Sequence, residues 1–207
     1  GLPLALSEMG ILCLDFVNTV DSRSAVQPRD LLGTYTDLVC WADRLGCLGH
    51  DETLALARLA GEAPDEAKAV HQWALAVRES IYGLLAAAAR HQPPPPGALS
   101  LFNRALSGAL GHLEIAQGGG GLAWAWSADL ALDSMLWPVV RSAAELLTSV
   151  QRGRIGECAA PDCGWLFLDA SRNHTRRWCD MNGCGNRAKA RRHYQRQRAL
   201  EEPASQA

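Results

Sequence analysis

The chain has 207 residues, enough for one medium-sized domain and a small one, and 48% of them are hydrophobic, which excludes wholesale disorder. Its net charge of −2 conceals an asymmetry. Residues 1–150 carry 9 Lys and Arg against 16 Asp and Glu, whereas residues 151–200 carry 11 against 4. The sequence therefore predicts an acidic body with a basic appendage, and such appendages often bind the phosphate groups of nucleic acids.

No stretch approaches the ~20 apolar residues of a membrane span, so we expect no membrane partner. Glu8 and Asp15 interrupt the apolar N-terminus and no basic region precedes it, so we expect no signal peptide. A cytoplasmic, reducing location follows, and there closely spaced cysteines more often bind metal than form disulfides.

Apolar residues at helical spacing predict a mainly helical N-terminal region. The first clear helix is expected over 31–45, with Pro28 in its first turn. Asp51 is a candidate N-cap for a short helix that reaches Leu59. The clearest helix begins near Pro64 and must end before the four prolines at 93–96.

After a further helix over 99–110, the apolar pattern changes its period. Apolar residues alternate over 113–117 and 122–126, on either side of a glycine run, which predicts a β-hairpin. A last helix of this region is expected over 130–150, and Pro138 should start or kink it because proline lacks a backbone donor.

Four of the seven cysteines form two pairs of identical spacing. Cys158 and Cys163 are separated by four residues, as are Cys179 and Cys184. Two such pairs supply the four soft ligands of one structural Zn²⁺, in a closed site that leaves no position for a reactive water. Two disulfides, four unlinked thiols, or His174 in place of one cysteine are the alternatives.

The remaining C-terminal pattern completes a small finger. A short apolar run over 165–168 indicates a strand of a hairpin between the cysteine pairs, and residues 187–200 suit a helix. The order of knuckle, hairpin, second knuckle and helix is typical of a treble-clef-like zinc finger. We therefore predict a mainly α fold with a small β-hairpin: a helical domain over 1–152, the finger over 153–200 and a tail over 201–207.

Basic residues are concentrated in this finger. From Arg172 to Arg198 there are nine Lys and Arg, opposed only by Asp180. Arginine binds phosphates bidentately and reads guanine edges, so we expect this surface to bind DNA; the alternative is that it neutralises the acidic body. Arg187 either reaches a base or phosphate or braces the finger through Asp169 or Asp180. The residues predicted to bind nucleic acid are Arg172, Arg176, Arg177, Arg187, Lys189, Arg191 and Arg192.

The N-terminal domain offers one candidate ligand site. Asp15 and Asn18 lie in an apolar run, where they would line a pocket for a small-molecule effector or form a buried hydrogen-bonded pair or helix cap. A homodimer is also expected, because one small finger covers few base pairs. The sequence contains no G-x-S-x-G, H-E-x-x-H or phosphate loop, so we expect no enzyme.

The residues at 184–187 spell CGNR, and the chain here resembles the CGNR zinc finger family. The stretch CLDFVNT at 13–19 is similar to the ABATE domain that usually precedes that finger. The resemblance implies a zinc-dependent, stress-induced bacterial transcription regulator that binds DNA. The alternative is an adaptor whose finger binds an acidic protein or RNA. Further matching finger residues are Cys158, Cys163, Phe167, Asp169, Ser171, Arg177, Trp178, Cys179 and Lys189.

Overall fold

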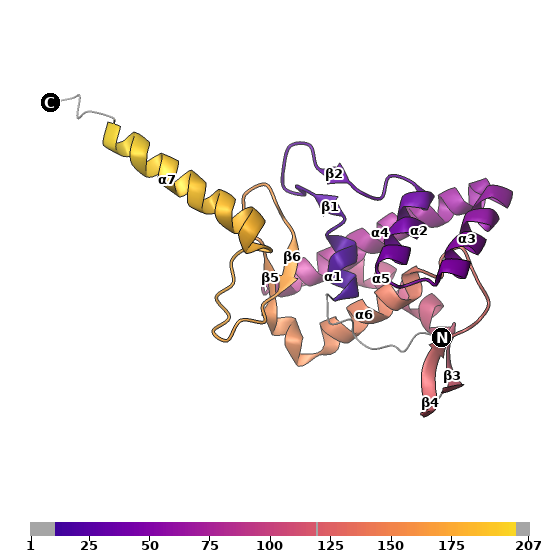
Figure 1. Ribbon diagram of the computed structural model, residues 1–207. Helices are drawn as coiled ribbons and strands as arrows, with labels where there is room; N and C mark the ends of the chain where they lie inside the picture. Colours follow the sequence, from indigo (N-terminus) through magenta and orange to yellow (C-terminus); the bar gives the residue numbers. More distant parts are fainter. Residues whose placement is uncertain (1–10, 119, 202–207) are drawn as a thin grey trace.

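The computed structural model describes residues 11–118 and 120–201. Most of the N-terminal tail and of the C-terminal tail therefore lies outside the described residues. Figure 1 shows a body of packed helices from which the last helix, α7, extends away. The body helices are α1 (Leu12–Val17), α2 (Tyr35–Arg44), α3 (His50–Glu62), α4 (Pro64–Ala89), α5 (Ala98–Leu110) and α6 (Leu136–Thr148).

Helix α4 is the centre of the body, because it packs against each of the other five body helices. Its predicted start at Pro64 is confirmed, with the proline in the first turn, where its missing N–H costs nothing. Val77 and Ile81 are fully buried on its apolar stripe. They face a core that includes Phe16 of α1 and Leu38 of α2. The apolar period thus predicted the helix that organises the domain.

Helix α2 lies within the predicted range 31–45, but it begins at Tyr35 and not near Pro28. The reason is a capping box. The Thr34 hydroxyl accepts a hydrogen bond from the Asp37 N–H, and the Asp37 carboxylate accepts one from the Thr34 N–H. These two bonds satisfy free backbone donors and fix the start of the helix.

Helix α3 also begins differently from the prediction. Gly49 is its N-cap, and the Glu52 carboxylate accepts the Gly49 N–H at 2.6 Å. Asp51 therefore does not cap the helix but lies in its first turn. Its negative charge there interacts favourably with the positive end of the helix dipole. The helix continues to Glu62, three residues beyond the predicted end.

Helix α6 is shorter than the predicted range 130–150, since it begins at Leu136. The preceding residues form a turn in which the Ser134 hydroxyl bonds both the N–H and the carbonyl of Ala131. Pro138 lies in the first turn of the helix, so it starts α6 and does not kink it.

Three antiparallel two-stranded sheets complete the fold. The hairpin predicted after α5 is confirmed, as Leu113 pairs with Trp126 and Ile115 with Trp124 across its strands. The strands are β1 (Val20–Asp21) with β2 (Arg29–Asp30), β3 (Leu113–Gly118) with β4 (Gly121–Trp126), and β5 (Ile155–Glu157) with β6 (Leu166–Leu168).

The finger differs from the prediction in the position of its hairpin. Strand β6 was expected, but its partner β5 precedes the first cysteine pair, so the first knuckle, residues 158–163, is the turn of the β5–β6 hairpin. A short 3₁₀ turn (Val150–Arg154) joins α6 to β5. A π-helical turn (Met181–Gly185) then leads into α7 (Asn186–Glu201). Helix α7 corresponds to the helix that was predicted over 187–200. None of the described helices is long and apolar enough to cross a membrane.

Candidate metal centre and basic surface

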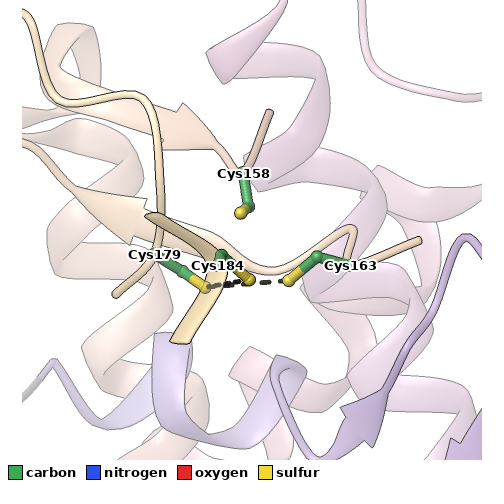
Figure 2. Close-up of side chains that lie close together, drawn as sticks. All are labelled: Cys158, Cys163, Cys179 and Cys184. Carbon is green, nitrogen blue, oxygen red and sulfur yellow. Dashed lines mark hydrogen bonds between the residues drawn. The ribbon is translucent and has the colours of Figure 1, made fainter. Parts of the chain in front are cut away.

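The thiol groups of four cysteines lie close together between the two knuckles of the finger. The Sγ atoms of Cys158, Cys163, Cys179 and Cys184 all lie within 4.8 Å of one another, and Figure 2 shows their side chains directed to one point. The Cys163–Cys179 and Cys179–Cys184 sulfur distances are both 3.7 Å. A tetrahedral ion with Zn–S bonds of about 2.3 Å places its sulfurs about 3.8 Å apart. The spacing fits a four-thiolate metal site and is too long for disulfides.

His174, the alternative ligand, is not part of this cluster. It is exposed in the loop after β6 and has a positive φ of 50°. The four cysteines are therefore the ligand set that the fold assembles, as the spacing predicted.

Backbone hydrogen bonds shape the first knuckle. The Cys158 N–H donates to the Trp165 carbonyl at 2.8 Å, and the Cys163 N–H donates to the Ala160 carbonyl at 3.1 Å. Gly164 follows with a φ of +70°, a conformation that glycine adopts without strain. The knuckle thus presents two thiolates from a tight turn.

The second knuckle, residues 179–184, is organised by Asp180. Its carboxylate accepts hydrogen bonds from the Asn182 N–H at 3.2 Å and the Gly183 N–H at 2.6 Å. Its carbonyl accepts the Gly185 N–H at 3.0 Å. Asp180 therefore caps the π-helical turn that carries Cys184, and it is not available to brace Arg187.

The β5–β6 hairpin is attached to the N-terminal body through Asn18. The Asn18 amide donates to the Leu166 carbonyl at 2.8 Å and accepts the Leu166 N–H at 2.9 Å, so it occupies the free edge of β6. Asn18 is therefore hydrogen-bonded, although to a distant strand and not to Asp15, and a ligand role for the two residues stays a prediction. Asp15 is half-buried, and burial raises its pKa.

Further contacts strengthen this attachment. The Trp165 indole donates to the Val20 carbonyl at 2.9 Å, and the Arg23 N–H donates to the carbonyl of the ligand Cys163 at 2.9 Å. The sequence did not predict these contacts, because their acceptors are backbone carbonyls that any residue provides.

The β5–β6 hairpin also shares the core of the body. Ile155 and Leu166 are buried in the same apolar cluster as the body helices. Arg90 of α4 forms an ion pair with Glu157 of β5 at 2.7 Å. By contrast, no hydrogen bond or ion pair among the described residues joins 170–198 to the body. The metal site therefore lies between a half-finger fixed to the body and a half-finger that carries α7.

Arg176, one of the residues predicted to bind nucleic acid, also makes contacts inside the finger. Its guanidinium donates to the carbonyl of Trp178 at 2.9 Å and to that of Cys179, and it lies 4.6 Å from the Phe167 ring centre. The Arg176 N–H donates to the Asp169 carboxylate at 2.9 Å. These contacts orient the guanidinium, which remains exposed, and its contact with nucleic acid stays a prediction.

Asp169 fixes the loop between β6 and the second knuckle. Its carboxylate accepts the N–H groups of Ser171 and Arg176. The Ser171 side chain first, and then these two N–H groups, hold the pKa of Asp169 below its usual value. Arg187 does brace the finger, but its partner is neither Asp169 nor Asp180. Its guanidinium donates to the Cys184 sulfur at 3.0 Å, a contact that stabilises a thiolate ligand.

The other predicted basic residues form an exposed surface. A notch of about 200 Å³ lies between the first knuckle and the first turns of α7, and we call it the basic notch. Arg172 and Lys189 lie outside this notch and are exposed. The charged residues that line it are Asp162, Arg177, Arg187, Arg191 and Arg192, beside Trp178.

Comparison with protein families agrees with this architecture. A family model named ABATE, described as a putative stress-induced transcription regulator, matches residues 10–150. A CGNR zinc finger model matches residues 154–197. No curated protein matches the chain significantly. Because the first match covers well over half of the sequence and the second follows it in the predicted order, the chain belongs to the ABATE family and carries a CGNR zinc finger after its ABATE domain.

Proposed function

We propose that this protein is a DNA-binding transcription regulator, not an enzyme, whose finger is held by one structural Zn²⁺. The observation that carries the proposal is the exposed basic surface on α7, which begins immediately after a metal ligand. From residue 189 to residue 198 every side chain of α7 is exposed.

The four-thiolate set supports zinc as the ion. Thiolates are soft ligands, and four of them in a tetrahedron close the coordination shell of Zn²⁺. Bound there, zinc would supply a structural crosslink between Cys158 and Cys163 on the body side and Cys179 and Cys184 on the α7 side. The chain's own contacts then orient the ligands, with Arg187 donating to one of the sulfurs.

The charges of α7 support nucleic acid as the partner. None of its Lys or Arg residues forms an ion pair with an acidic group in the described part of the chain, which disfavours neutralisation of the body within one molecule. A helix of 16 residues is about 24 Å long and fits the major groove of DNA. Arg191 and Arg192 line the basic notch, and we expect them to contact phosphates.

Salt dependence tests this proposal. Fluorescence anisotropy measures the affinity of the zinc-loaded full chain for labelled duplex DNA over a series of KCl concentrations. Arg191→Ala and Arg192→Ala should each lower the slope of log affinity against log salt by about 0.9, the value for one phosphate contact. Arg58→Ala, an exposed arginine on α3, is the matched control and should leave the slope unchanged. Duplex binding that is absent or independent of salt would overturn the proposal and favour an RNA or acidic-protein partner.

We also propose a homodimer, because two fingers cover a longer DNA site than one. Sedimentation of the full chain with and without a bound duplex tests this part: a single-chain mass in both conditions would contradict it.

A further inference from the structure

Besides the basic notch of the finger, the body has a hollow of its own, formed by residues distant from the finger in sequence. It has a volume of about 560 Å³ and lies between the α3–α4 junction and the segment that precedes α6. We infer that this hollow binds a lipophilic organic cation. Its apolar side chains are Leu59, Val70, Leu130 and Leu132, and its acidic ones are Glu62, Glu66 and Asp133.

The apolar lining indicates an organic ligand. The four aliphatic side chains are only half-buried, so a ligand with an apolar body would remove more of their surface from water. The volume lies in the range of small-molecule pockets, about 300–1,000 Å³. A metal ion alone would not suit the hollow, because aliphatic groups provide no oxygen, nitrogen or sulfur ligands.

The charges indicate that the ligand is a cation. Among the residues that the structure describes, no Lys, Arg or His lines the hollow. Glu66 and Asp133 form no ion pair among the described residues, and Glu62 has only Arg58, 4.0 Å away on an exposed helix face. The dipole of α4 places about half a positive charge at its N-terminus, beside the hollow. The negative charge of the three carboxylates is larger than this. The hollow thus combines an apolar floor with a net negative rim.

Calorimetric titration of the full chain with tetraphenylphosphonium tests the inference. This cation should bind with one equivalent per chain, and the neutral triphenylphosphine oxide should bind at least tenfold more weakly. The double variant Glu66→Gln, Asp133→Asn should lower the affinity for the cation by about tenfold, because each exposed carboxylate contributes a few-fold. Asp65→Asn, next to Glu66 but outside the lining, should leave it unchanged.

The inference would be overturned by no binding of tetraphenylphosphonium, or by equal affinity in the wild type and the double variant. Both substitutions preserve side-chain shape, and circular dichroism of the variants verifies that the fold is intact. Equal affinity for the neutral compound would also overturn it, since the hollow would then recognise apolar surface alone.

Discussion

The attachment of the finger to the body makes Asn18 the most informative residue to change. Asn18→Ala removes both hydrogen bonds to Leu166, a residue of β6 that is 1% exposed. It leaves the N–H and carbonyl of Leu166 without these partners. Each hydrogen bond contributes about 1 kcal/mol net, and each unsatisfied buried group costs about 1–3 kcal/mol. Because Asn18 is half-buried, water offsets part of this cost, and we expect a loss of about 2–3 kcal/mol.

Urea unfolding at neutral pH, followed by tryptophan fluorescence, measures this loss. The same variant should release zinc faster to a chromogenic chelator, because the N–H of Arg23 and the amide of Asn18 hold the segment that follows Cys163. Asn103→Ala, at an exposed position of α5, is the matched control. If both variants changed the free energy of unfolding by the same small amount, about 0.5 kcal/mol or less, the proposed attachment would be refuted.

Three further predictions concern charge, thiols and metal. Burial raises the pKa of Asp15, so the contribution of Asp15 to stability should fall as the pH rises from about 3.8 through that raised pKa; Asp15→Asn should therefore unfold at higher urea than the wild type at neutral pH, with the advantage lost in acid. Iodoacetamide should label the exposed Cys40 but not Cys13, whose pKa burial raises to about 12, as peptide mass spectrometry would show. Chelation should speed amide hydrogen exchange over 170–201 while 155–168 stays protected, since only the latter is bonded to the body; equal exchange in both segments would contradict this.

Local patterns predicted the elements that depend on local chemistry. The apolar period gave α4, since Val77 and Ile81 recur on one face, and the glycine run gave the β3–β4 hairpin. Helix starts were less predictable, because local hydrogen bonds compete with periodicity: Thr34 caps α2, and a turn held by the Ser134 hydroxyl precedes α6.

Contacts between segments that are distant in the chain could not be predicted from the sequence. Strand β5 has only three residues and no alternation, so its pairing with β6 leaves no pattern. Gly156 is needed there because a Cβ would lie 2.7 Å from the Phe167 ring, which becomes apparent only in three dimensions. The acidic hollow likewise joins residues near 60 to residues near 130. The cysteine spacing, by contrast, predicted which four thiols lie close together.

The division of the finger into two halves has an evolutionary and practical consequence. A zinc finger that folds independently can be moved between proteins by recombination. In this finger, Ile155 and Leu166 are instead buried in the core of the preceding domain. Cut out alone, it would expose those side chains and lose the edge partner of β6. Its exchange between regulators therefore requires the segment from Asn18 to Arg23 to travel with it, so the two domains should be inherited, transplanted and engineered as a single unit.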